Sequence, residues 1–246
     1  MRDISGEVGL VQIDAAQFLV TEEFRFSDAA VLKALTDKLE SDGVSPEAAR
    51  QAVDDARTIS PPRENPSDLA SIPRFMRWFD NSYGLHTLAA IIHDQLIVEE
   101  PNGGALGSDT LSDRFFREML RSAGVPWLKR WIIWAAVALR TRWAAGGLRR
   151  VSVCVWLVLA IIGITSFVYA VGSLCLGWSS PANPWLLLLV AVLLPLASAP
   201  LWGRQFGASL VAAVAALWVL PAAVFAAIGY LVYQVLESVA RRAGLS

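Results

Sequence analysis

Hydrophobic and polar positions divide the chain into two unlike parts. From Val151 to Gly203 no residue is charged, and after Arg204 the next charged residue is Glu237. The hydrocarbon core of a bilayer is roughly 30 Å thick and needs about 20 apolar residues in a helix to cross it. The pattern therefore predicts three membrane-spanning helices, at about residues 152–174, 185–202 and 208–234.

Before residue 148, apolar and polar residues follow one another over shorter stretches. Over residues 7–26, β-branched and aromatic residues partly alternate with polar ones, which predicts two short strands with Phe18, Val20 and Phe24 facing a core. Farther along, apolar residues recur at helical spacing, and Ser, Asp, Pro and Gly stand where helices begin or end. The helices expected on these grounds cover residues 29–41, 46–57, 85–98, 110–123 and 127–143.

These patterns predict an α+β protein of two domains. The first, residues 1–147, is a small N-terminal domain with short strands and several helices. The second, residues 148–246, is a three-helix transmembrane region. Of the 246 residues, 55% are hydrophobic. This value averages over the polar and the membrane parts, because the first 150 residues hold nearly all of the charged residues.

The distribution of Lys and Arg predicts the orientation in the membrane. Six bases lie between residues 129 and 150, just before the first span; the connection between the first two spans has none, and Arg204 lies between the second and third. Bases gather in cytoplasmic loops, so the N-terminal domain is expected in the cytoplasm, with the spans in the inner (cytoplasmic) membrane. The start, MRDISGEVGL, does not resemble a secretory signal. The side of the C-terminus stays open, because three spans place Arg241 and Arg242 outside.

Two further patterns bear on partners. In residues 127–143, Trp127, Trp131, Trp134 and Ala138 form a helical stripe flanked by bases, which is typical of a helix lying in the membrane interface. The helix at 46–57 has two Arg against three acidic residues, which argues against nucleic-acid binding. The expected partners are therefore the lipid bilayer and, through the transmembrane helices, a second copy of the chain.

Three separated motifs stand out in the polar part: Asp68-Leu69-Ala70-Ser71-Ile72-Pro73, then His93-Asp94 with Leu96, then Asp113 with Phe116 and Met119. In their order and spacing they resemble the motifs of the DUF1353 family, which is found often in phages and prophages. The resemblance covers roughly residues 8–147, with Ser67 where the family usually has Thr. It implies that the helical pair at 28–57 is an insertion and that the membrane region is an addition. The family carries no settled activity.

Two catalytic schemes stay open for these residues. In the first, Asp68, His93 and Asp113 bind a divalent metal ion near Asp94, and the metal acidifies a water molecule for hydrolysis. In the second, His93 is a general base beside Ser71 and is oriented by an acidic residue such as Asp94. No cofactor follows from the sequence beyond this metal.

Non-catalytic interpretations stay open as well. His93 and Asp113 would also suit a buried hydrogen-bonded pair without any reaction. Arg74 and Arg77 would suit an anionic ligand. Two functions follow: a membrane-anchored protein with a hydrolase-like site, or a non-enzymatic phage- or defence-associated membrane protein. In the second function, the polar domain binds a ligand or partner and the helices assemble in or perturb the membrane.

Overall fold

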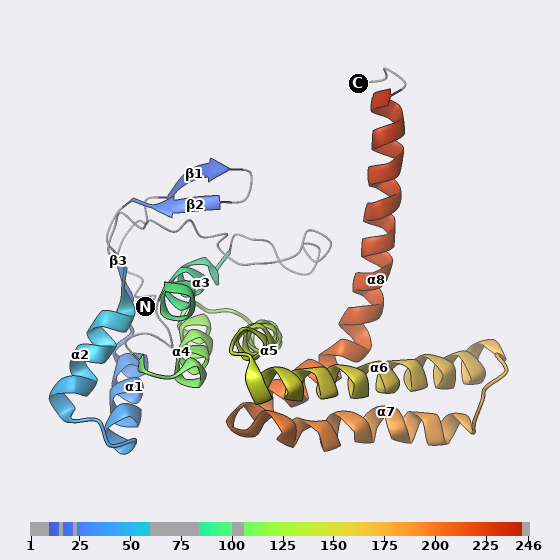
Figure 1. Ribbon diagram of the computed structural model, residues 1–246, viewed down its shortest axis with the longest axis horizontal. Helices are drawn as coiled ribbons and strands as arrows, with labels where there is room; N and C mark the ends of the chain where they lie inside the picture. Colours follow the sequence, from blue (N-terminus) through green and yellow to red (C-terminus); the bar gives the residue numbers. More distant parts are fainter. Residues whose placement is uncertain (1–9, 15–16, 22–23, 60–83, 100–105, 243–246) are drawn as a thin grey trace. The chain divides into compact units, whose positions relative to one another are not determined.

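A computed structural model describes residues 10–14, 17–21, 24–59, 84–99 and 106–242 of the chain (Figure 1). The chain divides into two compact units, and the boundary on α5 lies between Thr141 and Arg142. The first unit contains the helices of the polar part, and the second contains the long apolar helices. Each unit is described separately below.

Helices make up most of the described residues, so the α+β class predicted from the sequence is wrong and this part of the chain is all-α. The described strands pair only two by two: β1 (Leu10–Asp14) with β2 (Gln17–Val20), and β3 (Phe24–Arg25) with β4 (Thr58–Ile59), both antiparallel. A single two-stranded pair is marginal by itself and offers no layer for helices. The alternation in residues 7–26 was therefore a local signal. The side chains of Phe18, Val20 and Phe24 lie outside the described part.

The first two helices form a pair with caps that the sequence predicted. α1 (Ala29–Ser41) is capped by Asp28, whose carboxylate accepts hydrogen bonds from the backbone N–H groups of Ala30 and Val31. α2 (Pro46–Arg57) is capped by Ser45 and begins with a proline. Proline suits this position because the first N–H groups of a helix have no partner inside the helix. One face of each helix is buried: Val31, Leu35 and Leu39 on α1, and Ala49, Val53 and Ala56 on α2.

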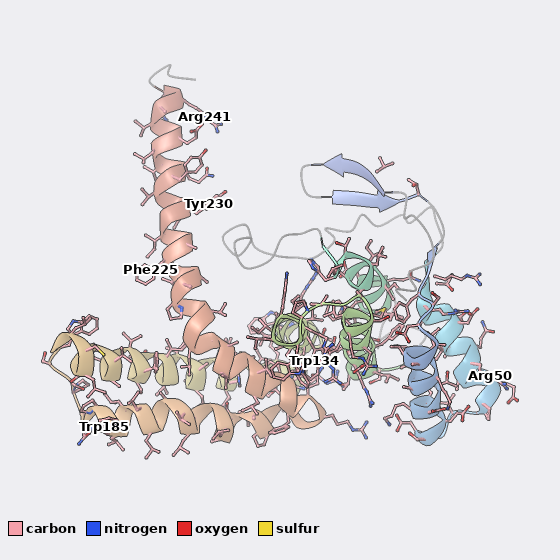
Figure 2. All side chains as sticks on the ribbon, turned by 180° about the vertical axis from the view of Figure 1, so that it is seen from behind. Arg50, Trp134, Trp185, Phe225, Tyr230 and Arg241 are labelled. Carbon is pink, nitrogen blue, oxygen red and sulfur yellow. The ribbon has the colours of Figure 1, made fainter. Side chains whose placement is uncertain are left out.

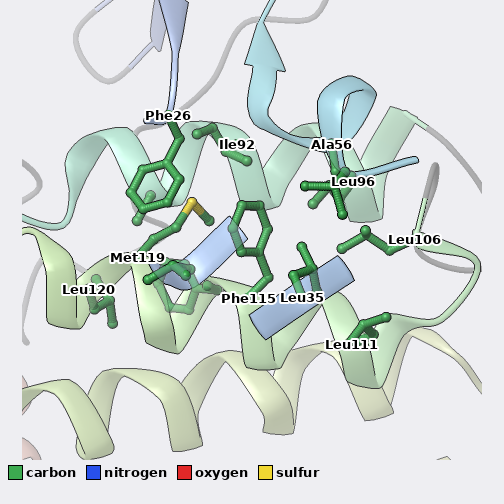
Figure 3. Packing of buried hydrophobic residues seen from close by; sticks show 14 of the residues in the cluster. Phe26, Leu35, Ala56, Ile92, Leu96, Leu106, Leu111, Phe115, Met119 and Leu120 are labelled. Atoms are coloured by element: carbon green, nitrogen blue, oxygen red, sulfur yellow. The ribbon is translucent and has the colours of Figure 1, made fainter. Parts of the chain in front are cut away.

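The core of this unit lies where α1 and α2 meet two further helices, α3 (Thr87–Asp94) and α4 (Asp109–Ser122) (Figure 3). The rings of Phe26 and Phe115 meet edge to face, with centroids 5.7 Å apart. Ile92 on α3 and Met119 on α4 are both buried beside them. This packing holds α3 against α4, and these two helices carry the candidate site.

One predicted helix changes its type along its length. The predicted helix at 85–98 changes at Gln95 into a π-helical segment, η2 (Gln95–Glu99), in which hydrogen bonds skip one more residue than in an α-helix. α5 (Trp127–Ala144) follows the predicted range 127–143 and crosses from the first unit to the second.

The second unit begins with a helical hairpin. α6 (Gly147–Leu176) is followed by α7 (Pro184–Ser198), and the two lie side by side in opposite directions (Figure 1). A 3-10 segment, η4 (Ala199–Gln205), then leads into α8 (Phe206–Arg242). Gly203 inside η4 has a φ of 54°, a backbone conformation that glycine adopts readily, so the chain turns there.

Three stretches of this unit are long and apolar enough to cross a membrane, and they mark the chain as a membrane protein: Gly147–Leu176, Pro184–Leu217 and Pro221–Arg242. Many of their large apolar side chains are exposed, as Phe225 is on α8 (Figure 2). The second stretch includes Gly203, where the chain turns, and the sequence predicts a break at the same place. Because these stretches are judged by length and composition, the domain limits and the positions of the spans in a bilayer stay predictions.

Candidate functional site

His93 occupies the last turn of α3 and faces the interior. The residues before it, Ala89 to Ile92, are all buried, which explains why this short apolar helix forms against α4. The His93 side chain is 8% exposed. An imidazole in such surroundings needs a hydrogen-bond partner, because an unpaired polar group loses its contact with water without compensation.

Asp113 on α4 supplies that partner. Nε2 of His93 lies 2.8 Å from Oδ1 of Asp113, and the Asp113 side chain is completely buried. Thr141 on α5 donates its hydroxyl to the same oxygen over 3.0 Å. Three helices thus meet at one carboxylate oxygen, within the first unit.

The contact with Asp113 determines the role left to each imidazole nitrogen. When Asp113 is ionised it can only accept hydrogen bonds, so Nε2 of His93 must carry the proton. In the neutral ring, Nδ1 then holds the lone pair, which can take up a proton or bind a metal ion. This arrangement of carboxylate and imidazole is the one that orients histidines in catalytic and metal sites.

Packing limits the movement of this imidazole. The rings of His93 and Phe116 have centroids 5.0 Å apart and planes inclined by 50°. Phe116 lies on α4 three residues after Asp113, so one face of that helix both bonds and stacks on the imidazole. Phe116, which the sequence placed in the third motif, therefore has an identifiable contact.

Asp94 lies directly after His93 but does not share its surroundings. Its side chain is half-buried, whereas that of His93 is buried. Neighbouring residues of a helix point in different directions, about 100° apart. The π-helical segment η2 begins at the next residue, and such segments frequently occur near functional sites.

The helix α5 is held on α4 by a stacked arginine. The guanidinium of Arg117 lies 4.7 Å from the ring centroids of both Trp131 and Trp134. Cation–π contacts of this kind are favourable, most of all where water is excluded. Trp134 is buried, and Thr141 follows it by seven residues on the same helical face. The Arg117 contact therefore helps to place the Thr141 hydroxyl at Asp113.

The structure answers only part of the sequence-based site prediction. It brings His93 and Asp113 together, and it adds Thr141, which the sequence did not single out because an isolated threonine among bases carries no motif. Among the described residues, no group of three or more His, Cys, Asp or Glu is placed to hold a metal ion. Four predicted site residues lie outside the described residues: Asp68, Ser71, Arg74 and Arg77.

Comparison with protein families gives a match in the polar part of the chain. The family model of DUF1353, described as a protein of unknown function, matches residues 44–137, so the polar part of the chain contains a DUF1353-like domain. The match is narrower than the predicted range of 8–147: it includes α2, α3, α4 and much of α5, and it leaves α1 outside. Comparison with curated proteins and with solved structures gives no significant match.

Proposed function

We propose that this chain is a membrane-anchored protein whose DUF1353-like domain carries a hydrolase-like site centred on His93. The observation that supports the proposal is the 2.8 Å contact between Nε2 of His93 and the buried carboxylate of Asp113. It leaves Nδ1 of a fixed imidazole as the nitrogen for chemistry. The family match and the three apolar helices support the two parts of the architecture.

In the metal-dependent form of this proposal, Nδ1 of His93 would help to hold a divalent ion. Asp68 and Asp94 are the other carboxylates proposed near the ion. Asp113 then acts as the outer carboxylate that orients His93, because its Oδ1 already receives His93 and Thr141. A bound divalent ion would lower the pKa of a water molecule and so supply a nucleophile for hydrolysis.

In the metal-free form, Nδ1 of His93 is a general base that removes a proton from Ser71 or from water. Asp113 holds the proton on Nε2 and stabilises the imidazolium that forms when Nδ1 takes up a second proton. Arg74 and Arg77 would bind an anionic group of the substrate in either form.

Hydrolysis and metal content of the full chain in detergent test the proposal. The substrates are 4-nitrophenyl acetate and bis(4-nitrophenyl) phosphate, each assayed with Mg²⁺, Mn²⁺ or Zn²⁺ and without metal. General acid–base catalysis contributes about 10²–10⁴-fold, so His93→Gln is expected to lower the rate by at least about 100-fold. The other buried histidine, His86, supplies the matched control, and His86→Gln is expected to keep the rate provided that the protein folds.

The metal dependence distinguishes the two forms. In the metal-dependent form, the wild-type chain retains close to one equivalent of a divalent ion, and His93→Gln loses it. In the metal-free form, activity survives a chelator. A wild-type chain that hydrolyses neither substrate under any condition contradicts the enzymatic proposal.

The buried and mutually bonded His93–Asp113–Thr141 contact also favours a second function, in which the network is structural. The chain is then a non-enzymatic, phage- or defence-associated membrane protein whose polar domain binds a partner and whose apolar helices assemble with copies of themselves. If His93→Gln folds and hydrolyses each substrate as fast as the wild type does, this function is favoured. Chemical cross-linking in native membranes, read as dimers or larger species, tests the self-assembly.

The proposed location is the inner membrane, with the N-terminal domain in the cytoplasm. The bases before α6 and at Arg204 support this orientation. Reporter fusions at residues 1 and 246 test it, and an exported N-terminus overturns it. An exported domain would change the accessible substrates, because only then could it meet the cell wall.

A further inference from the structure

The chain has no acidic residue between Glu118 and Glu237. Eight basic residues lie in the same interval: Arg121, Lys129, Arg130, Arg140, Arg142, Arg149, Arg150 and Arg204. An excess of bases beside membrane helices attracts anionic headgroups. The structure separates the bases that hold the protein together from those that face outward.

Arg142 belongs to the first kind. Its guanidinium donates to the carbonyl oxygen of Trp202 and to Oε1 of Gln205, each over 3.2 Å, and to Oγ of Ser152 over 2.8 Å. Ser152 lies in the first turns of α6, and Trp202 and Gln205 lie in η4. These bonds therefore bring the start of α6 to the turn before α8, within the second unit.

Three exposed bases lie on the two segments that Arg142 joins, the start of α6 and η4. Arg149 and Arg150 are exposed on the first turn of α6, and Arg204 is exposed on η4. Arg150 is held in position by Trp143: its Nε donates to the Trp143 carbonyl oxygen over 2.9 Å, and its guanidinium lies 5.5 Å from the indole centroid. That bond uses Nε and not the two terminal nitrogens, which carry the donors suited to a phosphate.

The surface around these arginines is apolar. Leu148 is 87% exposed and Val151 is 57% exposed, and both belong to the same first turns of α6. Trp143, 46% exposed, adds an indole of the kind found at membrane interfaces. Large exposed aliphatic side chains between arginines suit acyl chains below a phosphate layer, whereas a soluble phosphate or a nucleic acid would leave them in water.

We propose that Arg149, Arg150 and Arg204, with Trp143, form a binding site for the phosphate of anionic phospholipids. We call these four residues the arginine site. Arginine binds phosphate oxygens through paired N–H donors, and the aliphatic residues of α6 contact the lipid tails. The site depends on the membrane helices and not on the chemistry of His93, so it can fail or succeed independently of the proposed hydrolase activity.

Native mass spectrometry of the full chain tests the proposal. Chain released from detergent is titrated with phosphatidylglycerol, and separately with phosphatidylcholine carrying the same acyl chains. The wild type is expected to retain phosphatidylglycerol preferentially. A base near a membrane surface contributes about 1 kcal/mol, so each arginine removed is expected to weaken phosphatidylglycerol binding about fivefold. Arg149→Gln with Arg150→Gln should therefore cost roughly 25-fold, and adding Arg204→Gln should cost more.

The other end of the membrane region supplies a matched control. Arg241→Gln with Arg242→Gln removes the same charge from exposed positions of α8, where Arg241 pairs with Glu237. This pair is expected to leave phosphatidylglycerol binding within about twofold of the wild type, whereas non-specific attraction to net charge would weaken both variants equally. Circular dichroism shows whether the variants fold. If the double glutamine variant does not fold, Arg204→Gln alone and Trp143→Phe carry the test.

Three results overturn the proposal. The first is equal retention of the two lipids by the wild type. The second is equal weakening by the two double variants. The third is displacement of phosphatidylglycerol by millimolar glycerol phosphate or inorganic phosphate, which would identify the site as one for soluble phosphate.

Discussion

The Thr141 hydroxyl and the Asp113 carboxylate are 3.0 Å apart and both are buried, so α5 takes part in the polar contact that α3 and α4 share. The same hydroxyl also lies 3.1 Å from the carbonyl oxygen of Val137. A hydroxyl has one proton to donate, and an ionised carboxylate is the stronger acceptor. The hydroxyl therefore goes principally to Asp113, and α5 is tied to the candidate site.

Thr141→Val tests this bond. Valine keeps the shape but removes the donor, and one hydrogen bond to the buried carboxylate is lost. We expect a decrease of about 1–3 kcal/mol in the free energy of unfolding, measured by denaturant titration in detergent. Thr141→Ser retains a hydroxyl and should lose less. A larger loss in Thr141→Ser than in Thr141→Val would show that the methyl group, and not the hydroxyl, stabilises this position.

Local elements were predictable from the sequence where apolar spacing and caps agree. α1 and α2 have their predicted bounds, because Asp28 and Ser45 each cap a helix with one apolar face. The fold class was not predictable, since alternation over residues 7–26 indicates strands without revealing how many partners each strand finds. Here each described strand has a single partner.

The candidate site was predictable only where a motif marked it. His93 and Asp113 belong to separate family motifs, and their contact is one of the alternatives that the sequence left open. Thr141 and the Arg117–Trp131–Trp134 stack depend on how α5 packs on α4. The spacing of residues on α5 predicts only a stripe of tryptophans. Within this stripe, Trp134 is buried, whereas Trp127 is 66% exposed.

Asp28 is expected to make stability depend on pH in the acidic range. The hydroxyl of Ser122, 2.7 Å from Oδ2, and then the backbone N–H of Val31 hold the pKa of Asp28 below its ordinary value. Its contribution to stability is therefore complete above the unfolded pKa of about 3.9 and disappears as the pH falls through the lower folded pKa.

Two variants separate the charge of Asp28 from its cap. Asp28→Asn keeps an oxygen for the backbone N–H groups but loses the negative charge and one acceptor, whereas Asp28→Ala loses the cap and about 1 kcal/mol. Melting temperatures between pH 2.5 and 7 provide the measurement. The advantage of wild type over Asp28→Asn should be constant near neutral pH and shrink below about pH 4. An advantage that grows in acid would contradict this assignment.

Gly172 leaves room for the indole of Trp178 at the end of α6. A Cβ at this position would overlap Cε3 of Trp178, while the Trp178 backbone N–H donates to the Gly172 carbonyl oxygen over 3.2 Å. Gly172→Ala therefore forces the ring aside, and overpacking of this kind costs about 1–3 kcal/mol. Thermal unfolding in detergent measures the loss.

Gly229 provides the comparison for Gly172. Both glycines lie inside apolar helices, but nothing lies within 4 Å of a Cβ built at Gly229. Gly229→Ala is thus expected to be neutral or to stabilise by up to about 1 kcal/mol, because alanine favours a helix. Adding Trp178→Ala to Gly172→Ala should recover most of the loss. Failure of that double variant to recover would place the strain elsewhere.

Arg142 holds the turn between α7 and α8, and its loss should open that turn to a protease. Its guanidinium reaches the Trp202 carbonyl, Oε1 of Gln205 and Oγ of Ser152, a planar set of donors that lysine lacks. Trypsin cleaves after Arg204, which is exposed, whereas the neighbouring Gln205 is 3% exposed. We expect Arg142→Gln to speed cleavage at this bond about tenfold, and Arg142→Lys to speed it less. A tenfold increase corresponds to a loss of about 1.4 kcal/mol in the free energy of local opening, when this opening limits cleavage.

Fragment masses over time identify the cleaved bond, and Arg140→Gln, at an exposed position two residues earlier on α5, is the control. Faster cleavage in Arg140→Gln as well would indicate a general loosening of α5 and would contradict a specific role of Arg142 at η4.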